Sequence, residues 1–475
     1  MTGATFHMTQ PENPLLWAAQ AWVGGHWRQQ VLLQAGSDGH WAHIAGGQPC
    51  PEGATRLAGP VIPSLVNAHS HAFQRAFVGL AERRDSERDD FWSWRDRMYG
   101  VATRITPEQL QAVATHLYGE LLQGGYTQVC EFHYLHHQPS GQPYPPTGAD
   151  AAAGAMAAAL VGAAGTVGIG LTLLPVLYER AGFNAPALRH DQLRFATTVA
   201  QVLAMQRAAQ GPLVNSGLAV HSLRAAQAHS IQRLAQLAQS GVNGPIHIHV
   251  AEQTAEVDDC LANTGLRPIE WLTRHAALDA RWQLVHATHA TPQEIEAVAA
   301  SGAGVVLCPG TEANLGDGLC DLPRWLAAGV PLSVGSDSQV TRDWPQELRW
   351  LDYGQRLALR QRNVAAAPAT EPATAARLFE RMLHGGAAAA GFGRWGLEVG
   401  ARADLLVLNT QDPALLGLPA SHALDGVVFA SPLQPFAATM VAGRWVRPAK
   451  QPQTSSAFEA TMQSLWPDSD VRATG

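Results

Sequence analysis

Eight short apolar segments, separated by helical patterns, constrain the fold of this chain more than any other feature. The segments are rich in residues that favour strands, and turn signals bound them. They are Val61–Asn67, Tyr126–Glu131, Ile169–Val176, Leu218–His221, Ile246–Val250, Gln283–His286, Gly304–Cys308 and Leu332–Ser336. Helical patterns lie between them, as at Pro107–Gln123, Gln192–Ala209, Ala225–Gln239 and Pro292–Ala300. Alternation of this kind predicts an α/β fold with a parallel sheet, and eight units in roughly 275 residues match a (β/α)8 barrel of the TIM type.

The two ends of the chain have a different pattern from the barrel region. Residues 14–60 carry Trp, Val and Gly at short intervals, and the segments 403–408 and 438–446 also have strand character. We therefore expect a small β-sandwich domain built from residues 1–60 and 395–448, beside a barrel of residues 61–394. Residues 449–475 are polar and contain proline, so a surface tail is expected there.

Charge and cysteine content limit the classes of function. The net charge is −7 and the pI is about 6.3, so no overall basic field indicates nucleic acid or an anionic membrane as a partner. Five cysteines without a CxxC spacing argue against a disulfide framework or a thiolate metal site, and they favour a reducing, cytoplasmic location. The first twenty residues show no signal-peptide pattern. The uncharged segment 151–178 is rich in Ala and Gly, so we interpret it as a helix and a buried strand rather than a membrane span.

Histidines follow the first predicted strand at a spacing that suits a metal ion. His69 and His71 lie two residues apart, so their side chains point to the same side of an extended segment. Taken alone, this pair could equally be two polar residues at a strand end. Its position matters because TIM-type barrels place their active sites at the C-terminal ends of the strands.

Three further strand ends carry residues of the same kind. His249 ends the fifth strand, with Glu252 three residues later; His286 ends the sixth strand and Asp337 follows the eighth. We expect His247 to be a hydrogen-bonded core residue and His289 to begin a loop. Nitrogen and oxygen ligands without thiolate suit zinc, and iron or manganese are the other candidates. The sequence therefore predicts one metal ion held by His69, His71, His249 and Asp337.

Such a site predicts hydrolytic chemistry. A metal ion can lower the pKa of bound water to about 7, which supplies hydroxide at neutral pH. Asp337 is placed to ligate the metal and to take the proton of that water, and Glu252 can pass a proton to a leaving nitrogen. His286 can stabilise the developing tetrahedral centre electrostatically. Glu252 reaches the site only if the chain turns after Val250.

The pattern resembles the single-metal deaminase branch of the amidohydrolase superfamily. The resemblance covers nearly the whole chain: HxH after strand one, His-x-x-Glu after strand five, His after strand six, Asp after strand eight and the flanking segment 400–405. Longer segments resemble the formimidoylglutamate deiminases, namely 67–75, 91–95, 220–224 and 249–257. The resemblance implies a cytoplasmic homodimer of histidine degradation that holds one Zn²⁺ per subunit. In such an enzyme, metal-bound hydroxide attacks the formimino carbon of N-formimino-L-glutamate, and N-formyl-L-glutamate and ammonia are released.

A substrate with two carboxylates requires local cations in an acidic protein. Arg224 follows strand four and Arg95 lies in an aromatic segment after strand one; arginine suits bidentate carboxylate binding. The resemblance adds Gln74, Tyr134 and His221 as substrate contacts. Each residue has a structural alternative: Arg95 can pair with Asp90 or Asp96, and Arg224 can start a helix.

Two other functions remain open. One is a related deaminase acting on a purine, pyrimidine or triazine ring, for which Trp92, Trp94 and Tyr134 would provide stacking surfaces. The other is a barrel that serves as a non-catalytic scaffold. A scaffold should lack at least one ligand or the acid, whereas all six residues of the predicted centre are present.

Overall fold

The computed structural model describes residues 13–84, 91–145, 154–209, 211–446 and 451–467. Contacts divide the chain into two compact units. Met1–Ser64 and Arg394–Arg447 form unit 1, and Leu65–Gly393 and Pro448–Gly475 form unit 2. Each unit is built around its own sheet, and the functional residues predicted from the sequence all belong to unit 2.

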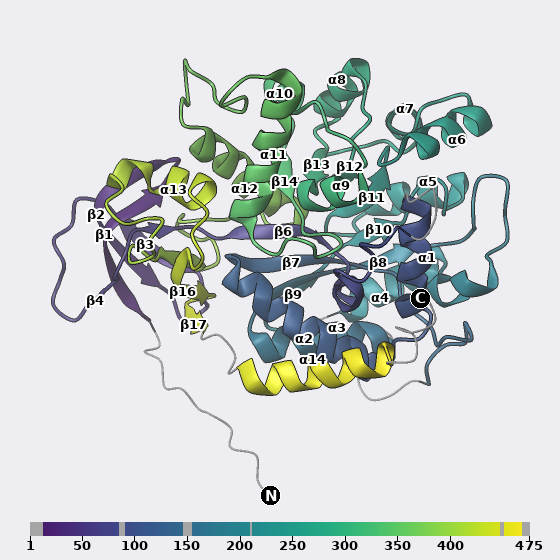
Figure 1. Ribbon diagram of the computed structural model, residues 1–475, viewed down its shortest axis with the longest axis horizontal. Coiled ribbons are helices and arrows are strands. Elements are labelled where there is room, and N and C mark those ends of the chain that lie inside the picture. Colours follow the sequence, from purple (N-terminus) through teal and green to yellow (C-terminus); the bar gives the residue numbers. More distant parts are fainter. Residues whose placement is uncertain (1–12, 85–90, 146–153, 210, 447–450, 468–475) are drawn as a thin grey trace, which may run out of the picture. The chain divides into compact units, whose positions relative to one another are not determined.

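Unit 2 contains eight parallel strands in a nearly closed barrel (Figure 1). In spatial order they are β6 (Leu65–Ser70), β7 (Tyr126–His133), β8 (Gly170–Leu177), β10 (Leu218–Val220), β11 (Ile246–Val250), β12 (Trp282–His286), β13 (Gly304–Leu307) and β14 (Leu332–Val334). A parallel bridge between Ser70 and Asp337 joins the last strand to the first. All residues of these strands are buried, as expected when helices cover a parallel sheet.

Helices surround the barrel strands of unit 2 (Figure 1). They are η1 (Ala72–Phe77), α1 (Phe91–Ala102), α2 (Pro107–Gln123), α3 (Ala155–Val167), η2 (His190–Phe195), α4 (Val199–Ala208), α5 (Ala228–Gln239), α6 (Thr254–Thr264), α7 (Pro268–His275), α8 (Pro292–Ser301), α9 (Pro309–Leu315), α10 (Leu322–Ala327), α11 (Trp344–Leu359) and α12 (Thr374–Ala389). Their boundaries follow local sequence signals. Thr106 and Thr291 cap α2 and α8, each with a Gln or Glu three residues later and a proline in the first turn.

Two predicted elements are divided in the structure. The segment 61–67 forms β5 (Val61–Ile62), which belongs to the sheet of unit 1, and then β6 of the barrel. Pro63 lies in the break, where its missing N–H cannot continue a ladder. The predicted helix 192–209 is likewise two elements, η2 and α4. The second of these begins at a new capping residue, Thr198.

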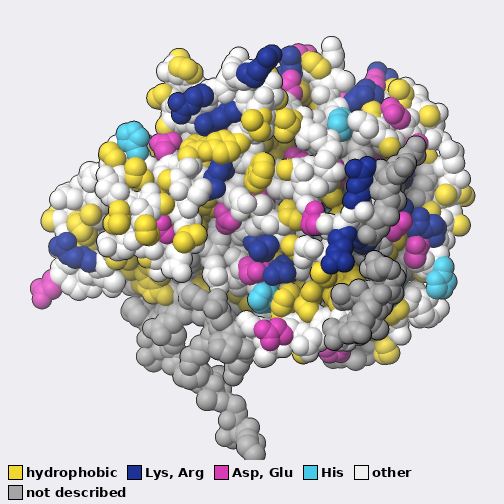
Figure 2. Space-filling model, viewed as in Figure 1, with side chains coloured by type: hydrophobic (Ala, Val, Ile, Leu, Met, Phe, Trp, Pro, Cys, Tyr) yellow, Lys and Arg dark blue, Asp and Glu magenta, His cyan; other side chains and the backbone are white. Residues whose placement is uncertain are grey.

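The uncharged segment that superficially resembles a membrane span forms a helix and a strand. Its described part is α3, which ends at Gly168 in the left-handed conformation, followed by the buried strand β8. Across the described residues, no helix is both long enough and apolar enough to cross a membrane. Side chains of both charge signs are scattered over the visible face of the molecule, consistent with a modest net charge (Figure 2).

Unit 1 brings strands from both chain ends into one sheet of eight strands. In hydrogen-bonded order the main path is β17 (Arg444–Val446), β16 (Phe436–Val441), β15 (Leu405–Leu408), β5, β1 (Leu15–Val23), β2 (His26–Ala35) and β3 (Trp41–Ala45), and β4 (Thr55–Arg56) pairs with β1. Leu16, Val31, Trp41, Leu405 and Met440 are among the buried residues of its core. A helix, α13 (Ala423–Phe429), and a single 3-10 turn, η3 (Ala420–His422), lie between β15 and β16.

The segment expected to be a surface tail contains a docked helix instead. Helix α14 (Gln451–Leu465) belongs to unit 2 and lies beside α2 (Figure 1). The ring of Phe458 stacks on His116 at 4.2 Å between centroids, and Trp466 Nε1 donates to Ala76 O at 2.8 Å. Leu465 is buried. The segment is polar overall, so the sequence analysis did not identify the few apolar residues that anchor one face of this helix.

The contact between α12 and β14 gives a test of barrel packing. A Cβ added at Gly385 of α12 would lie 1.9 Å from Leu332 O, so Gly385→Ala must push the helix off the strand. We expect a loss of about 2–4 kcal/mol in the free energy of unfolding. At Gly119 of α2 nothing lies within 4 Å of an added Cβ. Gly119→Ala should therefore be neutral or stabilise by about 0.5–1 kcal/mol. Denaturant unfolding of both variants measures the difference, and equal midpoints would contradict this packing.

Candidate active site

Three imidazole rings converge at the C-terminal ends of β6 and β11. His69 Nε2 lies 3.1 Å from His71 Nε2 and 3.0 Å from His249 Nε2. All three rings are buried, with at most 9% of each residue exposed. The three side chains thus place one nitrogen each around a common point, as the strand-end spacing predicts.

The second nitrogen of two of these rings shows why the three Nε2 atoms need a cation. His71 Nδ1 lies 3.0 Å from Phe132 O, and His249 Nδ1 lies 2.9 Å from His221 O. A carbonyl oxygen only accepts, so each Nδ1 donates its proton and each Nε2 carries a lone pair. Burial lowers the pKa of His71 to about 3 and holds the pKa of His249 well below its usual range. The Nε2 lone pairs of these two neutral rings both point toward His69 Nε2, so the three nitrogens are arranged to hold one cation.

Asp337 supplies an oxygen to the same point. Its Oδ1 lies 3.5 Å from His69 Nε2 and 3.4 Å from His71 Nε2. Ligands about 2.1 Å from a tetrahedral zinc ion are separated by about 3.4 Å, which is close to these distances. His69, His71, His249 and Asp337 therefore fit a single metal ion, with no change of backbone needed.

Close approach of β6 and β14 brings the aspartate to the histidines. Asp337 N donates to His69 O at 3.0 Å, and His71 N donates to Asp337 O at 3.2 Å. Gly335 makes this approach feasible, because a Cβ there would lie 2.6 Å from His69 Cβ. Burial, together with the charges of Glu252 and Glu312, raises the pKa of Asp337 to about 7, although His286 opposes the shift. The carboxylate is thus suited to exchange a proton near neutral pH.

His286 lies between the carboxylates of the site. Its Nε2 is 3.6 Å from Glu252 Oε1 and 3.9 Å from Asp337 Oδ2, and its Nδ1 is 3.3 Å from Glu312 Oε1. Burial lowers the pKa of His286, but the charge of Glu252 and the hydrogen bonds with Cys308 and Glu312 raise it more, so the net shift is upward. The carboxylates around His286 thus favour its protonated form.

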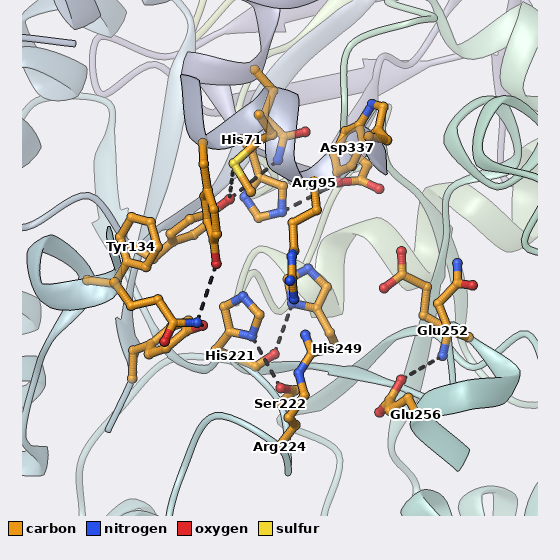
Figure 3. A pocket seen from close by; sticks show the side chains of 18 of the residues that line it. His71, Arg95, Tyr134, His221, Ser222, Arg224, His249, Glu252, Glu256 and Asp337 are labelled. Atoms are coloured by element: carbon orange, nitrogen blue, oxygen red, sulfur yellow. Dashed lines mark hydrogen bonds and ion pairs between the residues drawn. The ribbon is translucent and has the colours of Figure 1, made fainter. Parts of the chain in front are cut away.

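A sharp turn brings Glu252 into the site. Ala251 adopts a left-handed φ of 52°, which ends the extended course of β11. Glu256, one turn into α6, accepts hydrogen bonds from Ala251 N at 3.2 Å and Glu252 N at 3.1 Å. Figure 3 shows Glu252 and Glu256 on the opposite side of the pocket from Tyr134 and His221. The turn that the sequence requires after Val250 is thus held by a carboxylate that the sequence analysis did not assign.

The predicted substrate residues line a cavity next to these groups. Gln74, Arg95, Tyr134, His221 and Arg224 all contribute to its wall, together with His71, His249, Glu252, His286 and Asp337. The free space between the side chains is small, about 70 Å³. Gln74 Nε2 donates to Tyr134 OH at 3.4 Å, which links two of the predicted contacts.

Both predicted arginines reach this cavity (Figure 3). Arg95 lies over the ring of Tyr99, with its Cζ 5.6 Å from the centroid. Burial lowers the pKa of Arg95, and the positive charges of Arg224 and Arg189 lower it further. Of the alternative partners, Asp96 also affects this pKa, and Asp90 lies outside the described residues. Arg224 lies four residues before the first residue of α5 and does not start this helix. Two guanidinium groups in one enclosed space favour an anionic ligand.

The structure adds wall residues that the sequence analysis missed. Tyr99, Tyr178 and Gln192 line the cavity, and Gln192 Nε2 donates to Tyr178 OH at 3.1 Å and to Tyr99 OH at 3.4 Å. Ser222 and Glu256 also line the cavity. They lie within the segments 220–224 and 249–257, which resemble the formimidoylglutamate deiminases, so this resemblance could have identified them. Tyr178 directly follows β8 and Gln192 lies in η2, and no sequence periodicity predicts that these two residues meet.

His247 and His289 do not join the cluster. His247 Nε2 lies 2.8 Å from Ala389 O, so this ring is a hydrogen-bonded core residue. His289 follows β12 and lines a separate cavity. His247 and His289 therefore lie apart from the cluster of His69, His71 and His249, as their positions in the sequence indicate.

A barrel with a His-x-His pair, further histidines and an aspartate at its strand ends defines a class of metal-dependent hydrolases. The family model described as "Amidohydrolase family" matches residues 61–446. This chain belongs to the amidohydrolase family.

Individual relatives and solved structures show which members of the family the chain resembles. The chain is 43% identical to formimidoylglutamate deiminase of Pseudomonas aeruginosa over 458 residues, which covers 95% of this chain and 99% of the relative. An amidohydrolase structure from Brucella melitensis superposes with a TM-score of 0.88 at 38% identity, covering 95% and 99% of the two chains. A zinc-bound adenosine deaminase from Xanthomonas campestris has a TM-score of 0.75 at 23% identity, covering 94% and 97%, and shows that the fold is shared.

The ligand geometry predicts how metal binding affects stability. Zinc added to metal-free protein should raise the midpoint of thermal unfolding, because a ligand that binds only the folded state stabilises it. His249→Ala should lose most of this increase and reduce bound metal to well below one ion per chain. His43 is exposed in unit 1, so His43→Ala provides a matched control that should behave like the unaltered protein. Metal analysis and calorimetry test this, and full zinc retention by His249→Ala would refute the assignment.

Glu256 gives a separate prediction about the turn. Glu256→Gln keeps the size of the side chain but leaves one acceptor for two backbone N–H groups, so Glu252 should lose its fixed position. We expect kcat to fall about ten- to a hundredfold with metal content unchanged. Steady-state kinetics and metal analysis measure this. Unchanged kcat would show that Glu252 is placed by other contacts.

Proposed function

We propose that this chain hydrolyses N-formimino-L-glutamate to N-formyl-L-glutamate and ammonia. The observation that carries the proposal is 43% identity over nearly the full length of a formimidoylglutamate deiminase, in a chain whose cavity contains two arginines beside a predicted metal centre. The substrate has a formimino carbon, which water at the metal centre would attack. It also has two carboxylates, which Arg95 and Arg224 would bind. A role in histidine degradation follows from that substrate.

The metal centre supplies the water for the reaction. His69, His71, His249 and Asp337 would hold a divalent cation, which lowers the pKa of a water molecule toward about 7. Zinc suits this set of nitrogen and oxygen ligands, although iron and manganese share the preference.

The remaining steps belong to the side chains around that centre. Asp337 would accept the proton of the water, and Glu252 would deliver a proton to the leaving nitrogen as general acid. His286, 3.6 Å from Glu252 and 3.9 Å from Asp337, places positive charge where the tetrahedral centre gains negative charge.

The carboxylates of the substrate would bind on the other part of the cavity. Arg95 and Arg224 each offer a planar fork for a carboxylate, and Gln74, Tyr134 and His221 would orient the chain between the two groups. Trp94 also lines the cavity, while the side chain of Trp92 is not described. Trp94 and Tyr134 could stack on a ring substrate, but such a ring carries no carboxylate for Arg95 and Arg224 to bind. This favours the acyclic diacid over a purine, pyrimidine or triazine.

A scaffold without catalysis is disfavoured because the groups that chemistry requires lie within contact distance of one another. A homodimer in the cytoplasm completes the proposal by analogy with the deiminases that the sequence resembles. Size-exclusion chromatography with light scattering tests the dimer directly.

Ammonia release from a substrate panel tests the function. Zinc-loaded protein should release ammonia rapidly from N-formimino-L-glutamate and slowly or not at all from N-formimino-L-aspartate, guanine and cytosine. Glu252→Gln keeps the shape of the side chain but cannot donate a carboxylic proton, so kcat should fall by about 10²–10⁴-fold. Activity on a ring compound alone would keep the metal chemistry and refute the diacid substrate.

Arg224→Met serves as the control that separates binding from chemistry. It removes the charge while keeping much of the side-chain volume. Its kcat/KM for the diacid should fall strongly, by about 10²-fold or more, while metal content stays at one ion per chain. Loss of both metal and activity would instead indicate damage to the fold.

A further inference from the structure

A second cavity lies behind one wall of the active site. Its volume is about 420 Å³, and it opens to the solvent between α6, the loop after β12 and the segment before α10. Thr254, Thr288, His289 and Leu319 are among the residues that line it. None of these residues has a role in the proposed chemistry.

Two short segments separate this cavity from the active site. In the first, Gln253 faces the active site and the next residue, Thr254, faces the second cavity. In the second, Leu315 faces the active site and Leu319 the second cavity. Gln253 Nε2 donates to Asp317 Oδ1, so a single side-chain contact ties the two segments together. The two cavities therefore share this wall, in which consecutive residues line one cavity and then the other.

Three buried polar atoms near this wall have no protein partner. Among the described residues, Asp317 Oδ2, Thr288 Oγ1 and His289 Nε2 are buried and have no hydrogen-bond partner. Asp317 and Thr288 are each only 5% exposed. The three residues are neighbours, because a Cβ added at Gly318, next to Asp317, would lie 3.5 Å from His289 Cε1 and 3.8 Å from Thr288 Cγ2. Buried polar groups are nearly always paired, by protein or by water, so these atoms can bind a small polar molecule on a path from Gln253 to the second cavity.

We propose that this path is the exit for ammonia, a product no larger than water, from Glu252 to the second cavity. The inference rests on the proposed function. The general acid Glu252 protonates the leaving nitrogen, and Glu252 is the neighbour of Gln253 in the shared wall. Ammonia is therefore released next to the path rather than next to the arginines.

Charge favours the same direction. Arg95 and Arg224 line the part of the cavity that holds the carboxylates of the organic product, and they repel ammonium. On the other route, the carboxyl of Asp317 precedes Asp258 and Asp321 in the lining of the second cavity. Arg267 also lines that cavity, and its charge is paired with Glu294 at 3.1 Å. Burial and the charge of Glu252 raise the pKa of Asp317, so this group can give a proton to passing ammonia and take one back from solvent. Ammonia can thus leave while N-formyl-L-glutamate is still bound.

Substitutions at Thr288 test the path by changing its polarity without changing its size. Thr288→Val removes the hydroxyl, and Thr288→Ser keeps it. If ammonia leaves by this path, Thr288→Val should lower kcat about three- to tenfold with kcat/KM unchanged, because release follows the chemical step. A burst of N-formyl-L-glutamate of about one per active site should appear in the first turnover. Thr288→Ser should restore the kcat of the unaltered protein and abolish the burst.

A plug at the outer end gives a second, independent variant. Thr254→Phe places a ring in the second cavity, and Ala255→Phe adds the same ring at an exposed neighbour that lines neither cavity. Thr254→Phe should produce the same fall in kcat and the same burst, and Ala255→Phe should produce neither. This pair does not depend on how well Thr288→Val folds.

The outcomes separate the exit path from the proposed function. If zinc-loaded, unaltered protein releases no ammonia from N-formimino-L-glutamate, the function and the path are both overturned. If it is active and Thr288→Val and Thr254→Phe keep its kcat without a burst, only the path is overturned. A parallel fall in kcat and kcat/KM would assign these residues to the support of Glu252 and would also overturn the path.

Discussion

The convergence of three imidazole nitrogens on one point is the interaction on which the rest of the site depends. His69 Nε2 lies 3.1 Å from His71 Nε2 and 3.0 Å from His249 Nε2 in a buried place. Burial keeps all three rings neutral, so their nitrogens are available to a cation. The barrel must therefore be stable enough to hold the ligands in place before the metal binds. Parallel strands buried on both faces provide that rigidity.

The strand ends also explain how carboxylates reach the same point. His286, Asp337 and Ala251 all have left-handed φ values, between 45° and 69°. Non-glycine residues rarely adopt this conformation, and it costs free energy that the surrounding contacts must supply. In each case the chain changes direction at the mouth of the barrel, which turns a side chain inward. For Ala251 the supporting contacts are visible, since both carboxylate oxygens of Glu256 accept backbone N–H groups of the turn.

Much of this arrangement follows from the sequence, for reasons that differ between its parts. The fold class was predictable because eight apolar runs at regular spacing have few other solutions, and the structure confirms the barrel. The clustering of His69, His71, His249 and Asp337 was predictable because strand ends are aligned in a parallel barrel. The division of 61–67 between two sheets was not, since only the break at Pro63 signals it. The docking of α14 also escaped prediction, because a few apolar residues in a polar segment carry it. Long-range partners such as Gln192 and Tyr178 depend on loop paths that local patterns do not encode.

The cavity carries charges of both signs, and these charges restrict how a substrate can bind there. Arg95 and Arg224 line it together with the carboxylates Glu252, Glu256 and Asp337, and the charge of Arg224 opposes the rise in the pKa of Glu256 that burial causes. In the proposed function, the arginines bind the carboxylates of the substrate while its nitrogen-bearing end faces Glu252. We propose that the same charges act on the two products: the arginines retain the anionic one and the carboxylates attract the cationic one. Substrate orientation and product separation can then arise from one set of charged residues, which follow β6, β10, β11 and β14 along the chain.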